Sequence, residues 1–155
     1  MSRLRIFSDQ NPHVVLFETE QSDTMAEKLA TLGVGFERWP IRAINDHASN
    51  EEILAAYKPE IDELVINNGF NAVDVVSINP DHPDREIMRA KFLNEHIHKE
   101  DEIRFFVRGS GLFTMHIGNN VYEVLCQASD LIRVPDSTKH WFDMGPAPLF
   151  TAIRF

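Results

Sequence analysis

FLNEHIHKEDEIRFFVRG, the stretch from Phe92 to Gly109, carries the densest set of chemically active side chains in the sequence. His96 and His98 are two residues apart, so in an extended strand both imidazoles point to one face of the sheet. A short turn then reverses the chain, and Glu102 and Arg104 share one face of the strand that follows. The alternation therefore predicts that these polar side chains converge on one site.

His140, at the end of PDSTKH, supplies a third imidazole. Imidazole and carboxylate are ligands suited to Fe, Ni, Zn, Cu or Mn, and an octahedral ion held by four of them keeps two positions open. The alternative is a polar strand face in contact with solvent. We favour a metal, because Phe, Ile and Val surround the cluster and a buried carboxylate is costly without a compensating charge.

The spacing of these residues is more informative than their number. A His-x-His pair is expected by chance roughly 0.3 times in a chain of this composition, and adding Glu102 and Gly109 at their spacings lowers this to roughly 0.001. The full pattern, His-x-His-x3-Glu-x6-Gly followed by Pro135-x4-His140, resembles the two cupin motifs. Ser129 and Ser137 stand where the second motif usually has glycines.

The surrounding residues make the resemblance more specific. EHIHKEDEIRFFV, GLFTMHIG and HWFDMG, with GVGFERW upstream, are similar to the acireductone dioxygenases, from about Val34 to the end of the chain. In that family the acireductone 1,2-dihydroxy-3-keto-5-methylthiopentene reacts with O2 at one Fe(II) or Ni(II) ion in methionine salvage. The resemblance implies a set of four metal ligands: His96, His98, Glu102 and His140.

The same resemblance implies that Arg104 stabilises negative charge on the substrate. Iron chemistry in this family yields formate and 2-keto-4-methylthiobutyrate, whereas nickel chemistry yields formate, carbon monoxide and methylthiopropionate. Family members usually continue beyond the last strand, so we expect that a chain ending at Phe155 lacks the usual C-terminal extension. If that extension covers the pocket, substrate binding is looser or the protein is less stable without it.

Two other functions fit the cupin motif alone. An isomerase or epimerase acting on a sugar-like ketone would use the same ligands without O2. A sensor would bind a metal or small molecule without turnover. The family-specific residues, including FLNEHIHKEDEIRFFV and HWFDMG, argue against both.

Several further residues have two interpretations. From the pattern alone, Arg104 is equally suited to a salt bridge with Glu102 or Glu95. Three phenylalanines are candidates to line a substrate pocket, although a Phe more often packs in a core: Phe92, Phe106 and Phe142. His116 is predicted to lie on the opposite face from the buried residues of its strand. The remaining histidines are predicted to bind no ligand: His13, His47 and His82.

Composition excludes some partners. The chain has 155 residues, a formal net charge of −9 and one cysteine, Cys126. The negative charge opposes binding to nucleic acid or to an anionic membrane, and an anionic substrate needs local positive charge. No intrachain disulfide is possible, and the first ten residues lack the apolar stretch of a signal peptide. We predict a cytoplasmic monomer whose partners are the acireductone and O2.

Hydrophobic periodicity predicts helices in the N-terminal half and strands thereafter. Helices are expected over residues 22–32, 49–68 with a break at Pro59, and 83–91. Strands are expected over residues 3–7, 13–19, 34–39, 73–78, 95–98, 102–107, 111–117, 121–126, 130–134, 139–143 and 149–155. The first two strands are expected at a sheet edge. Closely spaced short strands favour a β-barrel, and the resemblance implies a cupin-type double-stranded β-helix or jelly roll. We expect one domain, with residues 1–91 packing on a metal-binding core of residues 92–155.

Overall fold

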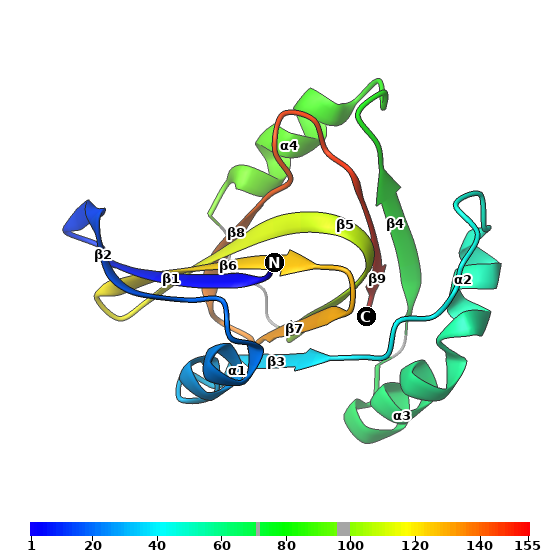
Figure 1. Cartoon of the computed structure of the whole chain (residues 1–155), viewed down its shortest axis with the longest axis horizontal. Coiled ribbons are helices and arrows are strands. Elements are labelled where there is room, and N and C mark those ends of the chain that lie inside the picture. Colours follow the sequence, from blue (N-terminus) through cyan, green and yellow to red (C-terminus); the bar gives the residue numbers. More distant parts are fainter. Residues whose placement is uncertain (71, 96–99) are drawn as a thin grey trace.

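The computed structural model describes residues 1–70, 72–95 and 100–155 (Figure 1). In these residues a curled nine-stranded sheet is flanked by helices that all lie in the N-terminal part of the chain. The strands are β1 (Arg3–Ser8), β2 (Asn11–Thr19), β3 (Gly35–Arg38), β4 (Asp74–Ile78), β5 (Glu102–Ile117), β6 (Asn120–Gln127), β7 (Asp130–Val134), β8 (Lys139–Asp143) and β9 (Phe150–Arg154). The helices are α1 (Ser22–Ala30), α2 (Asn50–Ala56), α3 (Lys58–Asn68) and α4 (Arg85–Leu93). The predicted mainly-β class is confirmed.

Strand β5 is the longest of these strands, and it joins the two halves of the barrel. Its first half pairs with β7 and β9, and its second half pairs with β6 and β8. The prediction of two separate strands divided by a turn at residues 108–110 is therefore wrong. Gly109 has φ of 77°, and an added Cβ would lie 2.0 Å from the carbonyl oxygen of Leu149. Glycine thus allows β5 to bend against β9 without ending, which a bulky residue would prevent.

The strand order is β2-β1-β6-β5-β7-β3, with β8 beside β5 and with β9 between β5 and β4. The expectation of an edge position holds for β2, whereas β1 lies between β2 and β6. All the pairings are antiparallel. Curling of the sheet brings the two halves of β5 to face each other across the interior (Figure 1).

Local signals position the helices. Ser49 and Glu52 form a capping box at the start of α2. The helical segment breaks at Tyr57, and Pro59 falls in the first turn of α3, where its missing N–H leaves no bond unmade. Helix α1 begins at the predicted residue but ends at Ala30 rather than at residue 32, and its N-cap, Gln21, makes no side-chain capping hydrogen bond.

Two apolar clusters lie on opposite faces of the sheet. One fills the barrel and includes Phe106, Phe113 and Phe142, while the other includes Phe105 and packs under α2 and α3. Neighbouring residues of β5 therefore contribute to different clusters, as strand alternation predicts. In the part of the chain that the structure describes, every helix is too short or too polar to cross a membrane.

The two serines at motif positions that usually hold glycine keep a left-handed backbone. Ser129 has φ of 81° and Ser137 has φ of 62°. Few residues other than glycine adopt such angles, because the Cβ crowds the backbone. Ser129 donates its backbone N–H to the carbonyl oxygen of Phe106 at 2.9 Å, which holds the β6–β7 turn against β5. Both serines therefore adopt backbone angles that glycine adopts more readily.

Candidate metal centre

Glu102 and His140 meet at the open end of the barrel. Glu102 begins β5, whereas His140 lies on β8 opposite Met115, in the second half of β5. Because β5 bends at Gly109, the two side chains come together, and Nε2 of His140 lies 2.6 Å from Oε2 of Glu102. The side chains are 3% and 13% exposed. Residues 38 positions apart thus form one buried contact.

The hydrogen bonds of His140 fit a metal ligand. Its Nδ1 lies 2.7 Å from the carbonyl oxygen of Thr138, which can only accept a hydrogen bond. Nδ1 therefore carries a proton, and Nε2 directs either a second proton or a lone pair toward the carboxylate of Glu102. Nε2 of His140 and the carboxylate of Glu102 could both serve as metal ligands, and a backbone carbonyl on the other imidazole nitrogen is the usual support of a metal-bound histidine.

The surroundings of His140 favour the charged form of its imidazole relative to a free histidine. Burial lowers the pKa of His140, but the hydrogen bonds to Glu102 and Thr138 and the negative charge of Glu102 outweigh it. The resulting pKa of His140 is raised above its ordinary value.

Arg104 contacts the other oxygen of the same carboxylate. Its Nη2 lies 2.7 Å from Oε1 of Glu102, and its side chain is only 14% exposed. Burial lowers the pKa of Arg104, and the charge of Glu102 offsets part of this effect. The salt bridge expected from the pattern is present to Glu102, while Glu95 lies 3.7 Å from Nδ1 of His116 instead.

The loop before β5 is anchored by an ion pair. Nε of Arg133 donates to Asp101 at 2.8 Å, and the backbone N–H of Asp136 donates to the same carboxylate at 3.0 Å. Burial raises the pKa of Asp101, but the Arg133 and Asp136 hydrogen bonds lower it more. Asp101 therefore fixes the start of β5 to the loop that leads to His140.

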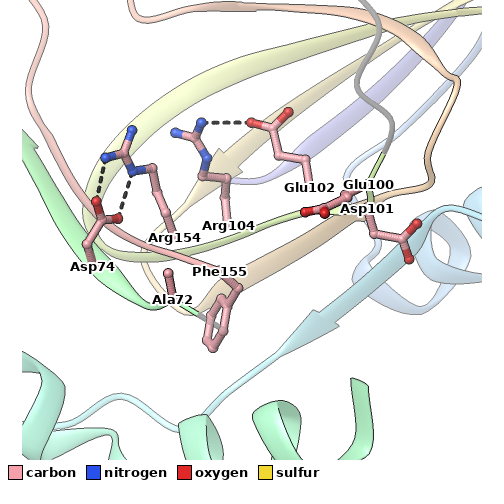
Figure 2. A pocket seen from close by; sticks show the side chains of 8 residues that line it. All are labelled: Ala72, Asp74, Glu100, Asp101, Glu102, Arg104, Arg154 and Phe155. Carbon is pink, nitrogen blue, oxygen red and sulfur yellow. Dashed lines mark hydrogen bonds and ion pairs between the residues drawn. The ribbon is translucent and has the colours of Figure 1, made fainter. Parts of the chain in front are cut away.

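A cavity of about 560 Å³ opens beside Glu102 and Arg104 (Figure 2). Glu102 and Arg104 point toward each other along one wall, and Arg154 lies next to Arg104 with its guanidinium held by Asp74 (Figure 2). The lining consists of Ala72, Asp74, Glu100, Asp101, Glu102, Arg104, Arg154 and Phe155. Sequence reasoning did not identify Asp74 or Arg154, although Arg154 is a lone charge in the apolar end of the chain, LFTAIRF.

The three candidate pocket phenylalanines pack against one another. The ring centroid of Phe142 lies 6.2 Å from that of Phe92 and 6.3 Å from that of Phe106. Phe106 and Phe142 belong to the apolar core of the barrel, and Phe92 packs against it. In the described residues the cavity lining contains none of the three, so their contact with a substrate stays a prediction.

The other histidines lie apart from this centre or outside the described residues. His96 and His98, the remaining candidate ligands, lie outside the described residues, and so does most of the strand predicted over residues 95–98. His116 lies 3.1 Å from Asp9, which agrees with a satisfied histidine on the outer face. Within the described ranges no three His, Cys, Asp or Glu side chains are grouped to hold a metal ion. The structure therefore brings together two of the four predicted ligands and Arg104.

Comparison with known proteins identifies the family. The family model described as "ARD/ARD' family" matches residues 3–155. The chain belongs to the ARD/ARD' family. Membership makes it an enzyme of the dioxygenase class, as expected from its motifs.

Curated relatives of the ARD/ARD' family cover the whole chain. An acireductone dioxygenase from Xylella fastidiosa (strain 9a5c) is 56% identical over 156 residues, which span 100% of this chain and 83% of the relative. An acireductone dioxygenase from Xanthomonas campestris pv. campestris (strain B100) is 57% identical with the same coverage. Such identity over the full chain supports a shared activity.

A solved structure of the family has the same fold. It is described as acireductone dioxygenase from Bacillus anthracis with a cadmium ion in its active center. It superposes with a TM-score of 0.88 at 29% identity and covers 99% of this chain and 91% of that one. The prediction of a cupin-type fold is confirmed, and a divalent metal is supported as the cofactor.

Proposed function

We propose that this chain is a metal-dependent acireductone dioxygenase that cleaves 1,2-dihydroxy-3-keto-5-methylthiopentene with O2 in methionine salvage. One Fe(II) or Ni(II) ion would be held by His96, His98, Glu102 and His140. The observation that carries the proposal is the 2.6 Å approach of His140 Nε2 to Glu102 Oε2, with Nδ1 of the histidine fixed by a backbone carbonyl. Family membership and the named relatives support the activity.

Different residues of the proposed site bind the metal, orient its ligands and stabilise charge on the substrate. When bound, the ion acts as a Lewis acid and a template for the enediolate oxygens. The carbonyl of Thr138 holds the His140 proton on Nδ1 and leaves Nε2 available as a donor atom. Glu102 offers one oxygen toward His140 and the other to Arg104. Arg104 thereby stands beside the substrate and stabilises its negative charge.

Apolar residues complete the proposed site. The side chains of Phe92, Phe106 and Phe142 form one apolar cluster in the barrel, because each packs against at least one of the others. In this proposal the cluster accommodates the methylthioethyl tail of the acireductone and excludes water from the charged end. Phe142 is central, because it contacts both other rings.

The product depends on which ion is loaded. The same four ligands serve Fe(II) and Ni(II), and both ions accept imidazole and carboxylate donors. The iron form would yield formate and 2-keto-4-methylthiobutyrate, and the nickel form would yield formate, carbon monoxide and methylthiopropionate. A monomeric state, a cytoplasmic location and a single domain spanning residues 1–155 remain part of this proposal.

The proposal is tested by oxygen uptake. Metal-free protein is reconstituted separately with Fe(II) and Ni(II), given the acireductone, and followed with an oxygen electrode while products are identified. We expect metal-dependent uptake that disappears in His96→Ala and persists in His47→Ala, a matched change at an exposed histidine outside the site. Stoichiometric metal binding without uptake in either form would contradict the proposal and favour a non-oxidative cupin function.

A further inference from the structure

A row of charged side chains crosses three neighbouring strands at the cavity. Arg104 on β5 is paired in register with Arg154 on β9, and Arg154 is paired in register with Asp74 on β4. Directly opposed residues on adjacent strands point to the same face of a sheet. Figure 2 shows the two guanidinium groups side by side on one wall of the cavity, with a carboxylate beyond each of them.

Two arginines in direct cross-strand register repel each other and do not stabilise a sheet by themselves. Here Glu102 compensates Arg104, and Asp74 compensates Arg154 through two hydrogen bonds of 2.8 and 2.6 Å. The positive charge of Arg154 adds to burial in lowering the pKa of Arg104. The arrangement concentrates positive charge at one place in a chain whose net charge is −9.

The two arginines differ in depth. The side chain of Arg104 is 14% exposed, whereas those of Arg154 and Asp74 are 37% and 57% exposed. Arg154 therefore lies toward the mouth of the cavity, where an entering ligand passes first. Asp74 engages Nε and Nη2 of Arg154 and fixes the plane of its guanidinium, which leaves Nη1 without a partner in the described residues.

We propose that Arg154, oriented by Asp74, is a second anion-binding residue of the cavity and binds the acireductone anion and its carboxylate product. This inference rests on the proposed function and names the charge-recognition element of the same site. A planar guanidinium fixed on one edge presents its other N–H groups to carboxylate or enediolate oxygens with little loss of side-chain entropy. Asp74 acts through Arg154 and is a positioning residue.

The position of Arg154 at the mouth of the cavity predicts how its replacement changes KM and kcat. It would hold the substrate equally in the ground state and in the transition state, so its loss raises KM more than it lowers kcat. Arg154→Gln should raise KM about tenfold, the effect of one charge-assisted hydrogen bond, while kcat changes by less than about twofold. Arg154→Lys should recover part of the affinity, and Asp74→Asn should raise KM by about threefold.

Arg89 provides a matched control. It binds Asp143 through the same two guanidinium positions, Nε and Nη2, at 2.9 and 3.3 Å, and its side chain is 35% exposed. Arg89→Gln therefore removes an equivalent ion pair at a different place on the molecule. We expect Arg89→Gln to leave KM unchanged. An increase of KM in Arg154→Gln is then caused by the loss of the arginine at the cavity and not by the loss of an ion pair in general.

The experiment combines steady-state oxygen uptake with calorimetric titration of 2-keto-4-methylthiobutyrate into metal-loaded protein. Unchanged KM and unchanged keto-acid affinity in Arg154→Gln, with wild-type metal content, would overturn the inference. If Arg154→Gln fails to fold, Arg154→Lys and Asp74→Asn decide the question by the same two measurements. Wild-type protein without oxygen uptake, but with keto-acid binding that depends on Arg154, would refute the proposed function and leave the anion site standing.

Discussion

The cavity wall has two ends, each built from an arginine and a carboxylate, and the two ends differ in burial. At the inner end, Arg104 Nη2 lies 2.7 Å from Glu102, and both side chains are at most 14% exposed. At the outer end, Arg154 Nη2 lies 2.6 Å from Asp74, yet these side chains are 37% and 57% exposed. Nearly equal distances thus join pairs in very different surroundings.

Burial, rather than distance, sets how much the loss of one partner of a charge pair costs in stability. Exposed ion pairs contribute about 0–1 kcal/mol to stability, whereas removing one partner of a buried pair costs about 3–5 kcal/mol. Glu102 is also joined to His140, so a change at the inner end disturbs three groups together. The outer pair can therefore be changed at small cost to the fold.

Glu102→Gln should have the largest effect, because it removes the charge common to both inner contacts. We expect oxygen uptake to fall at least about 100-fold with loss of bound metal. The free energy of unfolding should fall by about 3–5 kcal/mol, because Arg104 is left buried without a carboxylate. Elemental analysis, oxygen uptake and urea unfolding measure these quantities. Asp74→Asn, the same kind of change at the outer end, should keep its metal. Equal losses of metal and of unfolding free energy in Glu102→Gln and Asp74→Asn would contradict the distinction between the two ends of the wall.

Arg104→Met should have an intermediate effect, since it removes charge and preserves side-chain volume. Glu102 keeps His140 as a partner, so the loss of stability should be only about 1–3 kcal/mol in metal-free protein. The loss should shrink further when metal is bound, because the ion then compensates the carboxylate. We expect kcat to fall about 100-fold with metal content unchanged, as for removal of one group that stabilises developing charge.

Urea unfolding with and without a chelator, together with steady-state kinetics, tests this prediction. Arg104→Lys is the control, because it keeps the charge and loses the planar donor geometry. A variant Arg104→Met with wild-type kcat would show that the arginine only holds Glu102 in place. That result would restore the interpretation of Arg104 as a purely structural salt bridge.

Much of the fold follows from local signals. The break between α2 and α3 was predictable because Pro59 and the Ser49 capping box act within a few residues of their own positions. The continuity of β5 was not predictable, because Gly109 indicates a turn when only its neighbours are considered. Its role depends on the backbone of Leu149, 40 residues away, which approaches too closely for any side chain at Gly109.

The candidate site likewise contains some residues that local signals predict and others that depend on contacts between distant segments. Glu102 and Arg104 could be placed on one face because strand alternation is local, and His140 because its motif spacing matches a known pattern. The outer pair could not be found, since Asp74 and Arg154 meet only through the register of β4 with β9. The contact of Asp101 with Arg133, 32 residues away, is equally non-local.

The smallest predicted effect concerns the outer pair and pH. The hydrogen bond from Arg154 lowers the pKa of Asp74 below its ordinary value of 3.8, despite some opposing effect of burial. A carboxylate with a lower pKa in the folded state stabilises the fold above the unfolded pKa, and this contribution disappears as pH falls through the folded pKa. Asp74→Asn should therefore cost at most about 1 kcal/mol at pH 7 after screening by solvent.

Urea unfolding of wild type and Asp74→Asn from pH 7 down to pH 3 measures this difference. The two unfolding free energies should converge only below pH 3.8, and 1 M salt should reduce their separation at pH 7 because an exposed pair is screened. A separation of several kcal/mol that persists in high salt would show that Asp74 and Arg154 behave as a buried pair. The distinction between the two ends of the wall would then fail, because the outer pair would contribute as much to stability as a buried pair does.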